Sequence, residues 1–240
     1  MSKLDKSNYT KKQIKTLLAE RRSQKALAQL TSQQLPLKTL NQHTNSEYGF
    51  VIGNGTSRKG IDLSNLKPYG NVYACNAVYR EFEPDYLVAV DVKMINEIEK
   101  TGWQHTHEVW TNQNKAYRSY EGFKYFSPNK GWSSGPTALW MATQHHYTKI
   151  FILGFDYAGL DNGKGVNNMY AGTPNYKKTT DGATYYGNWE KQTANVIKEN
   201  SKIVFYRVIL PDNIIPQQLN KFNNLKHIYV EDFKKMFDLL

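Results

Sequence analysis

Short apolar segments alternate with amphipathic segments through most of the chain. Residues 92–102, 135–146 and 187–200 repeat their apolar positions every three to four residues, which predicts helices. The β-rich segments that predict strands are residues 48–53, 71–76, 85–91, 107–112, 149–156 and 202–208. Strands that alternate with helices form mainly parallel sheets with helices on both faces. The pattern therefore predicts an α/β fold: one Rossmann-like domain, residues 46–240, with an open, mainly parallel sheet.

Several predicted strands are apolar without interruption, as in the letters FVIG, YLVAV and IFILG. A strand with one solvent-exposed face alternates apolar and polar residues, whereas a strand that is buried on both faces does not. In open sheets of this kind, ligands bind beyond the carboxyl ends of the strands. The residues that directly follow each strand are therefore the candidates for a functional site.

Residues 1–45 differ from the rest of the chain, because they hold seven of its ten net positive charges. We expect a basic, partly helical N-terminal extension that ends in a linker rich in Thr and Gln. The apolar positions with helical spacing are Ile14, Leu17, Leu18, Leu27 and Leu30. Such a helix either rests on the domain with its charges in solvent or binds nucleic acid or another polyanion.

Residues 157–186 are rich in Gly, Asn and Thr and show no periodicity. A loop of this length within a compact domain is unusual unless it is a lid, a binding loop or disordered. It contains five tyrosines, and disordered segments are usually poor in aromatic residues. We predict a lid inserted into the domain.

Composition places limits on the setting. The 240 residues include a single cysteine, Cys75, so an intrachain disulfide is excluded and nothing requires an oxidising compartment. The first residues lack the apolar core of a signal peptide, and no apolar run reaches the roughly 20 residues that cross a bilayer. We expect a cytoplasmic protein without a membrane span, and leave its oligomeric state open.

Polar and small residues follow four of the predicted strands. The first strand is followed by Gly53, Asn54, Gly55, Thr56 and Ser57, and later strands by Asn76, Asp91 and Asp156. Glycine allows positive φ and close backbone approach, so free amide groups would be able to face a phosphate or a ribose. Asparagine donates and accepts, as recognition of a base or sugar hydroxyl requires. The alternatives are a tight turn with a helix cap after the first strand, and for Asp156 a bracing role in its loop.

A second candidate element is the start of the helix predicted over residues 135–146. Ser133, Ser134 and Gly135 precede its apolar run. The N-terminus of a helix with small hydroxyl side chains suits an anion. The alternative is that these serines only cap the helix. At the other end, His145 and His146 are expected to interact as cations with the negative end of the helix dipole.

Three ordered motifs resemble one family. The letters GNGTSRKGIDLSNL, VYACNAVYREF and SSGPTALWMATQHHYTKIFILGFDY are similar to the bacterial sialyltransferases of glycosyltransferase family 42. The resemblance spans residues 49–207. It implies a nucleotide-sugar donor, with CMP as the favoured nucleotide, and no cofactor beyond that donor.

The resemblance also implies roles for individual residues. Asn54 and Asn76 would hold the nucleotide and donor sugar, and Asp91 stands where the family has a donor-binding asparagine. The loop around Asn54 would be shaped by Gly53 and Gly55. The remaining implied donor contacts are Ser133, Ser134, Gly135 and, from the lid, Tyr157 and Tyr170.

One position departs from the family. A histidine serves there as general base in a Y-x-G-H context, whereas this chain has Asn188. Asparagine does not accept a proton in the useful pH range. Either another group is the base, with Asp156, Asp181 and Glu190 nearest in sequence, or the acceptor differs, or the protein binds without turnover.

These observations predict a glycosyltransferase-like protein that binds a nucleotide or nucleotide sugar and transfers the sugar to an acceptor. No DxD-type metal clamp is present, so we expect transfer without a metal. The alternatives are a nucleotide-binding protein without catalysis, and a nucleic-acid-associated accessory or DNA-modifying protein that acts through residues 1–45.

Overall fold

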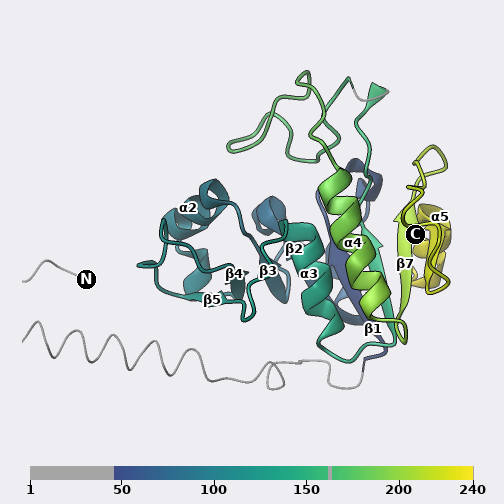
Figure 1. Ribbon diagram of the computed structural model, residues 1–240, viewed down its shortest axis with the longest axis horizontal. Helices are drawn as coiled ribbons and strands as arrows, with labels where there is room; N and C mark the ends of the chain where they lie inside the picture. The colour runs from purple at the N-terminus through teal and green to yellow at the C-terminus, as the bar shows by residue number, and fades with distance from the viewer. Residues whose placement is uncertain (1–45, 162–163, 240) are drawn as a thin grey trace, which may run out of the picture. The chain divides into compact units, whose positions relative to one another are not determined.

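Eight parallel strands form one sheet in the order β5-β4-β3-β2-β1-β6-β7-β8 (Figure 1). This computed structural model describes residues 46–161 and 164–239, and the predictions made for residues 1–45 lie outside them. The strands are β1 Tyr48–Ile52, β2 Gly70–Cys75, β3 Tyr86–Val88, β4 Val109–Thr111, β5 Phe123–Tyr125, β6 Lys149–Leu153, β7 Val204–Ile209 and β8 Leu225–Tyr229. The fold is the parallel α/β sheet of Rossmann-like type that the sequence predicts.

The central strands are buried on both faces, which explains their uninterrupted apolar sequences. In β1, Phe50 and Ile52 enter one core while Val51 enters the other, and all three are 0% exposed. In β2, Val72 and Tyr73 divide in the same way. Successive side chains of a strand point to opposite faces of the sheet. A strand buried on both faces therefore needs apolar residues on both of its sides.

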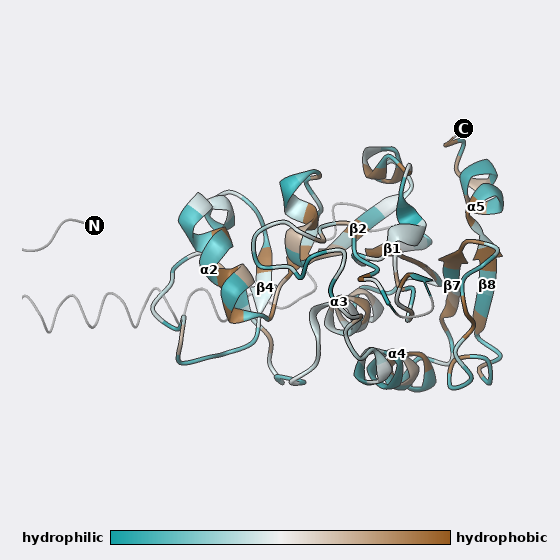
Figure 2. Cartoon of the chain, turned by 90° about the horizontal axis from the view of Figure 1, so that it is seen from above, coloured by the Kyte–Doolittle hydropathy of each residue, from teal (hydrophilic) through white to brown (hydrophobic). Residues whose placement is uncertain are grey.

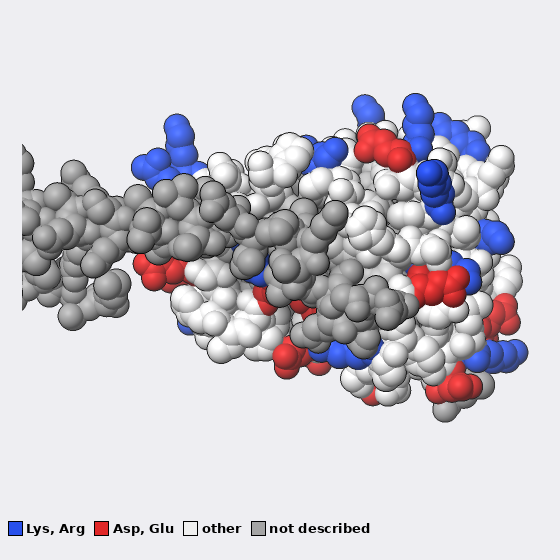
Figure 3. All heavy atoms as spheres, turned by 90° about the horizontal axis from the view of Figure 1, so that it is seen from below, with Lys and Arg blue, Asp and Glu red and all other residues white. Residues whose placement is uncertain are grey.

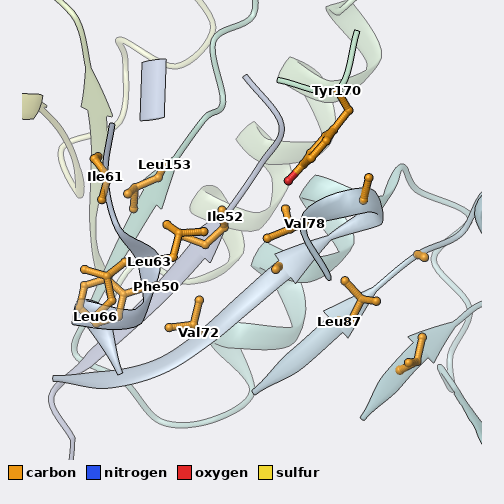
Figure 4. Close-up of a cluster of buried hydrophobic side chains, with 14 of the residues drawn as sticks. Phe50, Ile52, Ile61, Leu63, Leu66, Val72, Val78, Leu87, Leu153 and Tyr170 are labelled. Atoms are coloured by element: carbon orange, nitrogen blue, oxygen red, sulfur yellow. The ribbon is translucent and has the colours of Figure 1, made fainter. Parts of the chain in front are cut away.

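Different elements cover the two faces. The face that contains Val51 and Tyr73 packs against α3 (Ser134–Thr143) and α4 (Gly187–Glu199). The face that contains Phe50 packs against the 3-10 helix η3 (Leu63–Leu66), α2 (Val92–Thr101) and α5 (Val230–Met236). Figure 4 shows this second core around Phe50, with Leu63 and Leu66 beside it. The prediction of helices on both faces is confirmed.

Helix α2 buries one side only, whereas most residues of α3 are buried. In α2, Met94, Ile95 and Ile98 are buried, while most of the remaining residues are exposed or half-buried. Figure 2 shows this mixture of teal and brown residues along α2, in contrast to the brown of β7. None of the described helices is long and apolar enough to cross a bilayer. On the visible face in Figure 3, basic and acidic side chains are interspersed.

The sequence pattern missed the strands at both edges of the sheet. β5 has three residues, which is too short to show a period, and the apolar pattern of β8 is interrupted by the adjacent polar residues Lys226 and His227. Both are edge strands, where solvent and loops replace the second neighbour. The register of an edge strand is set by the strand beside it, so its own sequence carries less of the signal.

The helix end at His145 also differs from expectation. His145 is 4% exposed and shares a hydrogen bond with the Tyr73 hydroxyl, which in turn contacts the Tyr147 hydroxyl at 3.0 Å. Asn71 Nδ2 donates to the Tyr147 hydroxyl at 2.6 Å. Burial lowers the pKa of His145 from 6.5 to about 4. The side chain is therefore a neutral member of a buried network, and the prediction of a cationic cap is wrong for His145.

This network predicts a pH dependence of stability. The pKa of His145 is about 4 in the folded protein, against an ordinary value of 6.5 that applies to the unfolded chain. The contribution of neutral His145 to the free energy of unfolding is therefore complete above pH 6.5 and is lost as the pH falls toward 4. We expect wild type to lose about 2 kcal/mol more of its free energy of unfolding between pH 7 and pH 5 than His145→Gln does, measured by urea unfolding. The same change at exposed His105 is the control and should preserve the wild-type pH dependence. Equal losses in wild type and His145→Gln would contradict the assignment.

Candidate functional site

A cleft of about 410 Å³ lies at the carboxyl edge of the sheet, where the strand order reverses between β1 and β6. Crevices at such switch points are the usual ligand sites of open α/β sheets. The cleft is lined by the ends of β1, β2, β3 and β6, the start of α3 and the lid. The predicted site residues that line it are Gly53, Asn54, Gly55, Asn76, Asp91, Ser133, Ser134, Gly135, Asp156 and Tyr157.

Gly53 and Gly55 are needed because the loop after β1 touches the loop after β6. A Cβ on Gly53 would lie 2.5 Å from the Gly154 carbonyl oxygen, and one on Gly55 would lie 2.5 Å from Asp156 Oδ2. Neither Gly53 nor Gly55 has a positive φ. The sequence predicted close approach correctly, but the neighbours belong to the protein itself: the Gly154 backbone and the Asp156 side chain.

Four amide groups of this loop, those of Gly53, Gly55, Thr56 and Ser57, are occupied within the protein. Gly53 N–H donates to the Leu153 carbonyl at 2.7 Å and Gly55 N–H to the Gly154 carbonyl at 2.9 Å. Thr56 N–H donates to Asn167 Oδ1 at 2.9 Å. The expectation that these amides face a phosphate is therefore wrong. Thr56 and Ser57 themselves do not line the cleft.

Asp156 braces the two loops. Its Oδ2 accepts from Ser57 N–H at 3.0 Å and its Oδ1 from the Ser57 hydroxyl. Behind it, the buried Arg207 side chain donates to the carbonyls of Phe155 at 2.8 Å and Asp156 at 3.1 Å. Of the two roles that the sequence left open for Asp156, the structure supports the bracing role.

Ser134 joins three elements at the floor of the cleft. Its hydroxyl donates to Asn76 Oδ1 at 2.8 Å and accepts from Val90 N–H at 3.1 Å. Asn76 has a φ of 53°, a left-handed conformation that asparagine tolerates better than most residues. The end of β2, the end of β3 and the start of α3 are therefore held together by one side chain.

The start of α3 faces the cleft. Ser133 occupies the N-cap position, and its side chain makes no capping hydrogen bond. The first amides of a helix have no acceptor within that helix. Ser134 and Gly135, which carry the first amides of α3, line the cleft. The next residue, Pro136, has no amide hydrogen. This end of the helix is the part of the cleft best suited to negative charge.

Asp91 follows β3 and stands at the N-cap position of α2 without a side-chain capping bond. It lines the cleft and is exposed to the solvent there. The surrounding protein nevertheless partly desolvates the Asp91 carboxyl, which raises its pKa.

The lid, residues 157–186, packs onto the ends of β1 and β2 and forms the long loops at the top of Figure 1. Tyr176 is its contact with the site, because its hydroxyl accepts from Asn54 Nδ2 at 3.0 Å and from Ala77 N–H at 3.3 Å. Met169 N–H donates to the Asn54 carbonyl at 2.8 Å. Lys177 is the cation among the described residues that line the cleft.

The two tyrosines that the resemblance selected have other partners. Tyr170 is 7% exposed, lies in the core shown in Figure 4, and donates to Glu81 Oε1 at 2.5 Å while accepting from Arg58 Nη2 at 2.9 Å. It does not line the cleft. Tyr157 does line it, but its hydroxyl donates to Thr193 of α4 at 2.7 Å. Of the tyrosines in this segment that line the cleft, which are Tyr157, Tyr176 and Tyr186, the one hydrogen-bonded to Asn54 is Tyr176.

Asn188 is exposed at the start of α4 and is not among the residues that line the cleft, whereas its neighbour Trp189 is. Sequence reasoning also missed Tyr176, Lys177 and the lid asparagines Asn167 and Asn168. The tyrosine content of residues 157–186 argued against disorder, but no periodicity existed to show which side chains face the cleft. Among the described residues, no three of His, Cys, Asp and Glu gather as a metal site.

The close contact at Gly55 yields a stability prediction. Gly55→Ala would place a methyl group against Asp156 Oδ2 and separate the two loops, so we expect a loss of about 1–3 kcal/mol in the free energy of unfolding. Gly182→Ala is the matched control, since nothing lies within 4 Å of a Cβ there, and should change stability by less than about 0.5 kcal/mol. Urea unfolding of both variants tests this, and equal stabilities would contradict the tight junction.

Comparison with protein-family models, with curated proteins and with solved structures gives no match.

Proposed function

We propose that the protein is a glycosyltransferase-like protein that binds a nucleotide sugar, with CMP as the favoured nucleotide, and transfers the sugar without a metal. The observation that carries this proposal is the convergence of Asn54, Asn76 and the start of α3 on one cleft at the switch point of the sheet. A volume of about 410 Å³ lies within the range of small-molecule sites. The motif resemblance to family 42 sialyltransferases supports the choice of donor.

In this proposal the phosphate lies against the amides of Ser134 and Gly135, with Lys177 as counter-charge from the lid. In the loop after β1, the amides of Gly53, Gly55 and Thr56 are occupied, so this loop contributes mainly the Asn54 side chain. Asn54 and Asn76 would recognise the base or the ribose. Asn54 now donates to Tyr176, so a ligand that needs its amide group would take the place of that hydroxyl.

The lid would exclude water from the donor. Two hydrogen bonds anchor the lid to the Arg80–Glu97 ion pair: Arg80 Nη1 donates to the Thr173 hydroxyl at 2.8 Å, and Asn175 Nδ2 donates to Glu97 Oε2 at 2.6 Å. These contacts fix the segment around residues 173–175 on α2. Tyr176 and Lys177 follow directly, so the anchored turn sets their position over the cleft. Water exclusion strengthens electrostatic contacts to a developing phosphate leaving group.

A second candidate is nucleotide binding without catalysis. Asn188 replaces the histidine that the resemblance implies, and it stands outside the cleft lining. This candidate predicts the same ligand and the same contacts. Release of the nucleotide from its sugar separates the two.

The binding proposal is tested by thermal shift with CMP, UMP, GMP, AMP and their nucleotide sugars. A ligand at 100 times its Kd stabilises the native state by about 2.7 kcal/mol, and we expect CMP or a CMP sugar to raise the Tm most. Asn54→Ala should weaken this binding about tenfold or more, because it removes a polar contact in the cleft. Asn65→Ala, at an exposed asparagine outside the lining, is the control. Absence of stabilisation by every nucleotide would contradict the proposal.

The basic segment predicts a separate activity. Replacing Lys11, Lys12, Arg21 and Arg22 with glutamine in the full chain should weaken binding to duplex DNA and make its salt dependence shallower, because fewer counterions are released. Nucleotide binding to the cleft should stay unchanged. Fluorescence anisotropy with a labelled duplex from 50 to 200 mM salt measures this. Binding by wild type that does not respond to salt, or an unaltered slope in the variant, would contradict a polyanion role for residues 1–45.

A further inference from the structure

Two acidic side chains and no histidine occur among the described residues that line the cleft. The first, Asp156, is 5% exposed and accepts from Ser57 at both of its oxygens. The second, Asp91, is exposed to the cleft and makes no side-chain capping bond at the start of α2. Asp91 is therefore the carboxylate in this cleft that is open to a ligand.

The position of Asp91 is fixed by its neighbours. Val90 N–H, one residue earlier, donates to the Ser134 hydroxyl at 3.1 Å, and that hydroxyl donates to Asn76 at 2.8 Å. Asp91 is thus attached to the start of α3, where we place the phosphate, and to the end of β2. Asp91 therefore lines the same cleft as the start of α3, on a backbone that hydrogen bonds hold in place.

The groups around Asp91 are neutral near pH 7. Those in electrostatic contact with it are Cys75, at the end of β2, and Tyr117, after β4. Burial raises the pKa of Cys75 to about 12 and also raises the pKa of Tyr117. Lys93 lies two residues further along α2 and is exposed. Desolvation raises the pKa of Asp91 itself, which brings it closer to the value that a proton acceptor needs at neutral pH.

We propose that Asp91 is the general base that activates the acceptor hydroxyl, in the role that Asn188 does not fill. This inference rests on the proposed function. Asp91 then contacts the acceptor instead of the donor, which differs from the donor-binding role that the resemblance implies for this position.

In the transfer step, the oxygen of the acceptor hydroxyl attacks the anomeric carbon of the donor sugar. At the same time, the Asp91 carboxylate takes the proton of that hydroxyl. The new bond joins that oxygen to the anomeric carbon. The bond from the anomeric carbon to the phosphate oxygen breaks, and its electron pair leaves with the nucleotide. Water as acceptor follows the same path and gives hydrolysis of the donor.

The test uses the full chain and CMP-sialic acid, with water as acceptor, and measures CMP release from pH 4 to pH 9. We expect Asp91→Asn to lower kcat by about 10²–10⁴-fold while CMP binding, measured by thermal shift, stays within about threefold of wild type. The decline in rate on the acid side of the pH profile should disappear in this variant. Asp91→Glu should recover part of the rate. Asp62→Asn, at the exposed N-cap of η3, is the matched control and should keep wild-type rates.

Each other result overturns the inference. Release by Asp91→Asn at the wild-type rate removes Asp91 from the reaction, and a loss that consists entirely of weaker CMP binding makes it a donor-binding residue. If wild type binds CMP and releases none from the donor, the protein binds without turnover and no base is required. If wild type neither binds CMP nor releases it, the proposed function fails as well. Unfolding midpoints of the variants identify any loss that comes from misfolding.

Discussion

The architecture depends on the contact between the loops that follow β1 and β6. At the switch point of the sheet, these loops approach so closely that Gly53 N–H and Gly55 N–H donate to the backbone of β6 and its loop. Ser57 and Asp156 close the junction with two further hydrogen bonds. The junction occupies groups that in many nucleotide-binding folds face a phosphate. In the proposed function, the cleft beside it therefore binds its ligand mainly with side chains and with the start of α3.

This arrangement divides the polar residues at the strand ends into two kinds. The first kind forms hydrogen bonds within the protein and connects the two loops; its members are Ser57, Asp156 and the buried Arg207. Asn54 and Asp91 lie in the cleft with groups that a ligand can reach. The lid adds Tyr176 above them. Chemistry is expected from the second kind, and stability from the first.

The sequence alone predicted the central strands, the three longest helices and ten of the residues that line the cleft. These features come from local signals: uninterrupted apolar runs, helical periodicity and polar residues directly after strands. It could not assign hydrogen-bond partners over long separations. Tyr170 and Tyr176 lie six residues apart in the same loop, yet one enters the core and the other the cleft. The glycine motif correctly indicated close approach, while the identity of the neighbour depended on the folded sheet.

The most direct measurement of the central claim is a crystal structure of the full chain in complex with CMP. The account predicts the phosphate at the start of α3, the base or ribose within hydrogen-bond distance of Asn54 or Asn76, and the junction between the β1 and β6 loops unchanged. A nucleotide bound away from this edge of the sheet, or a phosphate held by the amides of Gly53 and Gly55, would contradict it.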